Sequence, residues 1–289
     1  MGLFKTIVAY LSFALLAVLF FLYVLFPGEA LEAYVGDRLA GIDASLSLSA
    51  DSIRPSLPLA VSFSDVDLMR QDDTILHIDQ ARLSPALSTL LKEQKRFEGR
   101  ASLAGGTVDG RLFMEGSGTD RRLRAEADLS AIRLERITAL ESFTGFTLAG
   151  PLNGRLTHDG ARAPLGQANG LLTAPGLTIT LKDPVFGINQ LTMDQTEADF
   201  SINGNTLRLK ALTFAGPLME GKISGRIEIE NPFGLSQLRL SGNVKPRPEL
   251  FARLQDTIPQ GILNPRTLGT RGVNFRIFGT IDNPDVSMR

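Results

Sequence analysis

The sequence predicts a mainly β protein, in which one N-terminal transmembrane helix precedes an elongated, curved, largely antiparallel β-sheet domain with a few short helices. Three observations support this fold class. A long uncharged apolar run lies near the N-terminus, apolar and polar residues alternate along much of the remaining chain, and short Gly-x-aliphatic units recur between the alternating segments. Alternation with a period of two is typical of strands that have one apolar face and one polar face.

The uncharged run predicts an anchor that crosses a membrane. It extends over 21 residues from Thr6 to Phe26, and a rise of ~1.5 Å per residue gives a helix of about 31 Å, close to the ~30 Å hydrocarbon core. The run is longer than a signal-peptide core, and no small-x-small cleavage site follows it. We therefore expect an uncleaved helix over 6–26. Representative anchor residues are Thr6, Leu11, Leu15, Leu19, Leu22 and Phe26.

The charges that flank this run predict its orientation. Lys5 and the terminal amine precede it, whereas Glu29, Glu32 and Asp37 follow it. The excess of positive charge on the cytoplasmic side of membrane helices places the N-terminus in the cytoplasm. We expect residues 1–5 to be cytoplasmic, 27–41 to form a short amphipathic helix or connector, and 42–289 to form one exported β-rich domain. A division of that domain near residues 130–145 is the alternative.

The strand pattern is clearest where Leu123, Ala125, Ala127 and Leu129 alternate with charged residues. One face of this strand is apolar and the other is charged, as expected for a sheet with one solvated side. The same alternation occurs in the segments 177–181, 223–229, 238–244 and 275–281. Short helices are expected over 84–91, where Ser84 and Pro85 resemble a helix start, over 134–143 and over 248–254.

Five Gly-x-aliphatic units form a weak internal repetition, and they begin at Gly106, Gly150, Gly216, Gly242 and Gly279. Two longer copies are nearly identical, namely Thr-Leu-Ala-Gly-Pro-Leu over 147–152 and Thr-Phe-Ala-Gly-Pro-Leu over 213–218. Glycine allows a strand to bend or bulge, so repeated units of this kind could curl a long sheet. Ordinary hairpin glycines are the other interpretation.

Composition and motifs argue against an enzyme. The net charge of −1 favours no nucleic-acid partner, and the absence of Cys excludes disulfides, thiolate metal sites and cysteine nucleophiles. The segment from Gly216 to Ser224 has the spacing of a phosphate-binding loop, but Ile223 replaces the required Ser or Thr and the residues alternate as in a strand. We expect no catalytic residue, no cofactor-binding residue and no metal ligand.

The chain resembles the type II secretion system protein N family, whose outline is shared with AsmA-like envelope proteins. The resemblance rests on the N-terminal anchor, the early strand residues 57–60 and 66–68, the segment 82–91 after a strand, and the Gly-x-aliphatic strands that end in Phe-Gly-Thr-Ile-Asp-Asn-Pro over 278–284. It implies an open curved sheet with an apolar inner surface, an anchor in the bacterial inner membrane and a periplasmic domain over 42–289. It implies no catalytic residue.

Two functions follow as expectations. The first is a non-enzymatic component of the type II secretion machinery, whose partners are the membrane and other secretion-system or envelope proteins. The second is an AsmA-like module that binds or transfers lipid or another apolar ligand. For that function the candidate apolar groove is lined by Leu177, Ile179, Ile227 and Leu240.

Overall fold

A computed structural model describes residues 23, 25–40, 45–56, 59–70, 73–89, 92–116, 122–160, 166–185, 187–230, 232–254 and 272–288. Of the expected transmembrane helix over 6–26, only Tyr23, Leu25 and Phe26 belong to this part, and the rest lies outside the described residues. Within the described part, no helix combines the length and the apolar character needed to cross a membrane.

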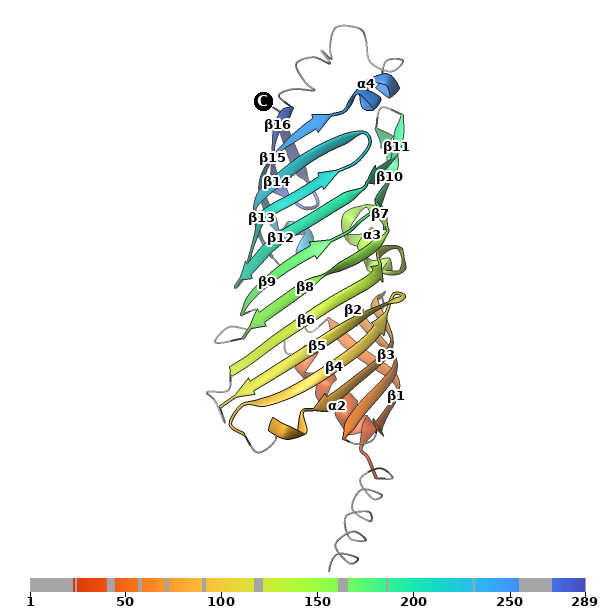
Figure 1. Ribbon diagram of the computed structural model, residues 1–289, viewed down its shortest axis with the longest axis vertical. Helices are drawn as coiled ribbons and strands as arrows, with labels where there is room; N and C mark the ends of the chain where they lie inside the picture. The colour runs from red at the N-terminus through yellow and green to blue at the C-terminus, as the bar shows by residue number, and fades with distance from the viewer. Residues whose placement is uncertain are drawn as a thin grey trace, which may run out of the picture.

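Most described residues belong to one antiparallel sheet of fourteen strands. The strands follow one another in chain order from β1 to β17, and only β7, β10 and β11 are left out. Figure 1 shows the strands stacked along the long axis of the molecule, with β1 to β3 and β16 turning behind the middle strands. The strands are β1 Leu46–Ser56, β2 Ala60–Arg70, β3 Asp73–Pro85, β4 Lys95–Leu103, β5 Gly106–Glu115, β6 Arg122–Arg133, β8 Pro151–Asp159, β9 Gln167–Thr173, β12 Gln195–Asn203, β13 Thr206–Ala215, β14 Met219–Glu228, β15 Gln237–Pro246, β16 Val273–Thr280 and β17 Pro284–Met288.

A smaller sheet and several short helices complete the described structure. The small sheet has the order β11-β10-β7, with β7 at Phe146–Ala149, β10 at Leu177–Val185 and β11 at Ile188–Met193. Its strands lie beside one end of the main-sheet strands in Figure 1. The helical segments are α2 Gly28–Ala40, η1 Leu87–Thr89, η3 Leu134–Arg136, α3 Thr138–Thr144, η4 Phe233–Leu235 and α4 Pro248–Leu254.

These elements confirm the mainly β class, with one large antiparallel sheet and few short helices. The helix expected over 84–91 is partly wrong, because Ser84 and Pro85 end strand β3 and pair with Glu98 and Phe97 of β4. A residue that precedes proline favours extended backbone, which is consistent with Ser84 in a strand. The helical structure in this segment is limited to the short 3-10 helix η1, which follows the end of β3.

The alternation of side chains changes phase at two non-glycine residues with left-handed backbone, Asp65 (φ 48°) and Ala131 (φ 53°). Apolar residues are spaced by two from Leu123 to Ala131, but Ala131 is exposed, and the buried side chain is Ile132, three positions after Leu129. The β6–β8 register shifts between Leu129 and Ile132. The left-handed residue therefore keeps the apolar side chains of β6 on one face, as expected for a β-bulge.

The two edges of the main sheet differ. Helix α2 packs beside β1, and Glu32 accepts a hydrogen bond from the backbone N–H of Ala50 at 3.0 Å. At the other edge every residue of β17 is exposed, including Val286 (59%) and Met288 (75%). The described residues therefore cover the first edge strand and leave the last one open to solvent.

The best-packed region lies where the small sheet meets the main sheet. Leu134, Ala174, Leu177 and Met193 are buried together there. The partly buried residues packed against them are Leu140, Leu148, Leu152, Ile179, Leu191, Phe214 and Met219. This cluster joins α3, the small sheet and one end of the main-sheet strands. Elsewhere in the main sheet, Ala60 and Val66 of β2 and Leu103 of β4 are also buried.

Candidate functional site

The apolar side of the main sheet is the candidate site. Residues that are directly paired in a β-ladder project from the same face of the sheet, so the register defines rows of side chains that cross the strands. We call two of these rows the apolar face. One row is Pro55, Val61, Leu83, Gly99, Gly110, Ala127, Leu156, Gly170, Phe200, Leu209, Gly225, Leu240, Ile277 and Val286. The other row is Ile53, Phe63, Ala81, Ala101, Val108, Leu129, Gly154, Leu172, Ala198, Leu212, Ile223, Gly242, Phe275 and Met288.

Both rows cross all fourteen strands of the main sheet without one polar side chain. With ~4.8 Å between neighbouring strands, each row is roughly 62 Å long when measured along the sheet. Apart from Gly170, every residue in the two rows is half-buried or exposed, and Leu83 is 40% exposed. A sheet covered by a second layer would bury such side chains, as Met193 (4% exposed) is buried in the cluster where the two sheets meet. The apolar face therefore has no complete second layer within the described structure.

Three aromatic rings shape this side of the sheet. A Cβ added to Gly221 would lie 2.6 Å from Phe214 Cζ, and one added to Gly242 would lie 2.6 Å from Phe275 Cζ. Gly170 has the same relation to Phe200. In each case the glycine is the direct cross-strand partner of the phenylalanine. Because glycine has no side chain, each ring can lie over its partner glycine. The surface of the sheet is therefore flatter at these positions.

The four residues of the expected groove divide into two pairs. Ile227 on β14 and Leu240 on β15 are half-buried and lie on the apolar side of the main sheet. Leu177 and Ile179 lie on β10 of the small sheet, where Leu177 is 8% exposed and belongs to the buried cluster. The structure thus brings Ile227 and Leu240 to one surface and uses Leu177 and Ile179 in packing. Sequence alternation showed which residues share a strand face, but it did not show that β10 belongs to a second sheet.

Two of the five expected structural glycines contact the small sheet. Gly150 has φ +134°, and an added Cβ would lie 3.2 Å from Gly176 O and 3.3 Å from Leu177 Cα. Gly216 lies outside the left-handed region, but an added Cβ would overlap Thr192 O and lie 3.1 Å from Met193 Cα. The two nearly identical Gly-Pro-Leu units therefore mark two places where the chain passes close to the backbone at β10 and β11.

At the other three positions, local contacts or backbone torsion angles also explain the need for glycine. Gly279 has φ +93°, which favours glycine. Gly106 approaches the backbone of Ser130 and Ala131, where an added Cβ would lie 2.5 Å from Ser130 O. Gly242 is covered by the Phe275 ring. Different contacts therefore require glycine at similar sequence units.

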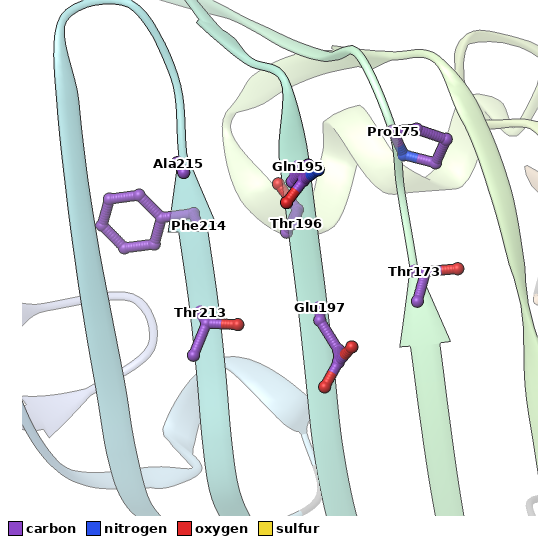
Figure 2. Close-up of a pocket in the computed structure, with 8 residues that line it drawn as sticks. All are labelled: Thr173, Pro175, Gln195, Thr196, Glu197, Thr213, Phe214 and Ala215. Atoms are coloured by element: carbon purple, nitrogen blue, oxygen red, sulfur yellow. The ribbon is translucent and has the colours of Figure 1, made fainter.

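A hollow of about 470 Å³ lies between the ends of β9, β12 and β13, and Figure 2 shows the residues that line it. Glu197 lies between Thr213 and Thr173 on the neighbouring strands, whereas the ring of Phe214 points away from Glu197. Glu197 is the one ionisable side chain among the described residues that line this hollow. The lining thus offers a carboxylate and hydroxyl groups but no acid–base pair.

The solvated side of the sheet, which we call the polar face, has a small cluster around His77 on β3. The carboxylate of Asp67 accepts a hydrogen bond from His77 Nδ1 at 2.7 Å, and Asp65 and Asp79 lie 3.9 Å from Nε2. The bond to Asp67 and the negative charge of the three carboxylates raise the pKa of His77 above its ordinary value of 6.5. Within the described part of the chain, no three His, Asp or Glu side chains are arranged to hold a metal ion.

The groove expected from the sequence did not include most of the apolar face, such as Phe200 and Leu209, and it left out Ile277 although the alternation over 275–281 had placed this residue on one face of a strand. The alternation within each segment could have assigned these residues to an apolar face, but their alignment across strands depends on the register. Comparison with protein-family models, with characterised proteins and with solved structures gave no match.

Proposed function

We propose that this protein is a non-enzymatic envelope protein that shelters the acyl chains of lipids on the apolar face of its main sheet. The observation that carries the proposal is the pair of uninterrupted apolar rows across all fourteen strands, whose side chains are not fully buried. Monomeric soluble proteins rarely expose a contiguous apolar surface of more than a few hundred Å². Such a surface indicates a binding partner that covers it.

Hydrocarbon is the partner that fits these rows best. The backbone N–H and C=O groups of the inner strands are paired in the ladders, and the rows offer no polar side chain that could orient a polar ligand. Removing apolar surface from water contributes about 25 cal/mol per Å² without any directional bond. An acyl chain that lies along the rows would gain this energy over a long contact, and the small relief of the Phe–Gly pairs would allow it to lie close to the sheet.

The test uses two neighbouring residues of β15 that face opposite sides. Leu240→Glu places a charge on the apolar face, whereas Ser241→Glu places the same charge on the exposed side opposite Arg276. Native mass spectrometry of the full-length chain purified in mild detergent should show bound lipid in the wild type and in Ser241→Glu. Lipid should be reduced in Leu240→Glu, with an unchanged circular dichroism spectrum. Absence of lipid from the wild type, or equal loss in both variants, would contradict the proposal.

We propose in addition that the chain acts in the type II secretion machinery, anchored in the inner membrane with its N-terminus in the cytoplasm and its β-domain in the periplasm. The resemblance of the sequence supports this role, and the exposed strand β17 favours a protein partner, because an open strand edge can pair with a strand of another chain. Affinity purification of the tagged full-length protein should recover a secretion-system component, and deletion should impair secretion. Normal secretion together with no recovered component would exclude this role.

A further inference from the structure

Three arginines lie side by side on the polar face, on three consecutive strands. The register pairs Arg208 of β13 with Arg226 of β14, and Arg226 with Arg239 of β15. Direct partners in an antiparallel ladder have Cβ atoms about 4.5–5.5 Å apart. We call these three residues the arginine ladder. It lies on the side of the sheet opposite to the apolar face, so it is separate from the lipid site proposed above.

Among the described residues, only the central arginine of the ladder has a carboxylate within ion-pair distance. Arg226 Nε lies 3.7 Å from Glu228 Oε1, and its side chain is 51% exposed. Among the described residues, no carboxylate lies within ion-pair distance of Arg208 or Arg239, and both are exposed. Lys210, on the same strand as Arg208, adds a further positive charge and pairs with Asp199 at 2.9 Å.

The row of directly paired residues that contains the arginine ladder continues across the sheet. At the N-terminal end of the sheet, this row has a different pattern of charges. There Glu98, Arg111 and Glu126 are direct partners on β4, β5 and β6, so that opposite charges alternate. Like charges that are directly opposite each other destabilise a sheet, whereas opposite charges stabilise it. The three adjacent arginines therefore reduce the stability of the isolated fold, and a bound anion would remove this repulsion.

The surroundings leave room for such an anion. A hollow of about 980 Å³ is lined by the three arginines together with Ser201, Lys210 and Ser224. Leu209 and Gly225, which belong to the apolar rows, also border this hollow. Guanidinium groups donate paired hydrogen bonds to phosphate oxygens, and serine hydroxyls can donate further ones.

We infer that the arginine ladder binds a phosphate group, carried either by a free anion or by a lipid headgroup. Two neighbouring guanidinium groups bracket one phosphate, and the third provides an adjacent position for the rest of the ligand. Nine strand spacings of ~4.8 Å place β13 roughly 43 Å from β1 along the sheet. The ladder is thus far from the N-terminal end of the molecule (Figure 1), and a lipid headgroup would have to come from a lipid that has left the anchoring membrane or from a second membrane.

Isothermal titration calorimetry of the full-length chain in neutral detergent tests the inference with three probes. These are inorganic phosphate, dihexanoyl-phosphatidylglycerol and dihexanoyl-phosphatidylcholine, of which the last is zwitterionic. We compare the wild type with Arg226→Gln, with Arg208→Gln/Arg239→Gln and with Arg100→Gln. Arg100 is the matched control, since it lies on the same face, is 72% exposed and is paired with Asp109 at 2.6 Å.

Saturable binding of inorganic phosphate would identify the free anion as a sufficient ligand. Binding of the phosphatidylglycerol but not of phosphate would identify the headgroup. In either case each arginine removed from the ladder should weaken binding about five-fold, because each basic side chain near a phosphate contributes about 1 kcal/mol. Arg100→Gln should bind as the wild type does.

A second measurement separates a ligand site from simple loss of folding. In buffer without phosphate, Arg226→Gln should unfold at the same or a higher urea concentration than the wild type, because the central like charge is gone. No saturable binding of phosphate or phosphatidylglycerol would overturn the inference. Equal weakening by Arg100→Gln, or undiminished binding by both ladder variants, would overturn it as well.

Discussion

The close contact between the two sheets makes Gly216 the most informative position for substitution. Gly216 has ordinary backbone torsion angles, but a Cβ there would overlap Thr192 O and lie 3.1 Å from Met193 Cα and 3.2 Å from Met193 Sδ. Backbone atoms of β11 cannot move aside without disturbing the buried cluster that contains Met193. Overpacking of this kind costs about 1–3 kcal/mol, and we expect Gly216→Ala to lower the free energy of unfolding by about 2 kcal/mol.

Two other glycines separate steric overlap from backbone strain. Gly204 has φ +57° with nothing within 4 Å of an added Cβ, so Gly204→Ala carries backbone strain alone, about 1 kcal/mol. Gly36 in α2 has neither a left-handed φ nor a neighbour within 4 Å. Gly36→Ala should therefore stabilise the helix by up to about 1 kcal/mol, because alanine has the higher helix propensity.

Urea unfolding of the full-length chain, followed by circular dichroism at equal m-values, measures all three variants. At an m-value of about 2 kcal/mol per M, Gly216→Ala should lower the midpoint by about 1 M, which is roughly twice the effect of Gly204→Ala. Gly36→Ala should leave the midpoint unchanged or raise it. A midpoint for Gly216→Ala at or above that of the wild type would refute the close contact between the sheets as the reason for this glycine.

Three further predictions concern other parts of the molecule. The pKa of His77 is raised in the folded state, so its contribution to stability is complete below pH 6.5 and is lost as the pH rises through the folded-state pKa; an NMR titration of His77 with a midpoint below 6.5 would contradict this. Ser236 is fully buried and its Oγ accepts a hydrogen bond from Glu230 N at 3.0 Å, so Ser236→Ala should cost about 1–2 kcal/mol in a thermal or urea melt, and an unchanged midpoint would exclude a role for this bond. A reporter that is active only outside the cytoplasm should be active when fused after Arg289, and the protein should stay in the membrane after carbonate extraction; activity of a cytoplasm-only reporter would reverse the predicted orientation.

Strand identity could be predicted from the sequence because the alternation is local. Leu123, Ala125, Ala127 and Leu129 indicated a strand, and they lie in β6. The pattern did not show that Ile132 rather than Ala131 is the buried residue after Leu129, because the left-handed Ala131 changes the phase of the strand. The backbone N–H of Ala131 donates a hydrogen bond to Asn153 Oδ1 on the neighbouring strand at 2.8 Å. A contact between residues so far apart in the chain has no local sequence signal.

The site was harder to predict because it depends on register. Leu177 and Ile227 have similar alternating surroundings in the sequence, yet β10 joins β7 and β11 in the small sheet while β14 joins the main sheet. The arginine ladder shows the same limit, since Arg208, Arg226 and Arg239 become neighbours only through strand pairing. Sequence alternation determines which residues share a face of a strand, whereas long-range pairing determines which strands share a surface.

Acyl chains that lie on the apolar face of the main sheet would be within reach of a photoreactive group on the ligand. The most direct test of this placement is photo-crosslinking of the full-length protein in membranes with a diazirine-bearing fatty acid, followed by mass spectrometry of the labelled residues. Label is expected on apolar-face residues such as Phe200, Leu209 and Leu240, and unlabelled fatty acid should compete for it. Little label is expected on polar-face neighbours such as Ser201 and Ser241. Label confined to residues 1–26, or distributed equally between the two faces, would contradict this placement.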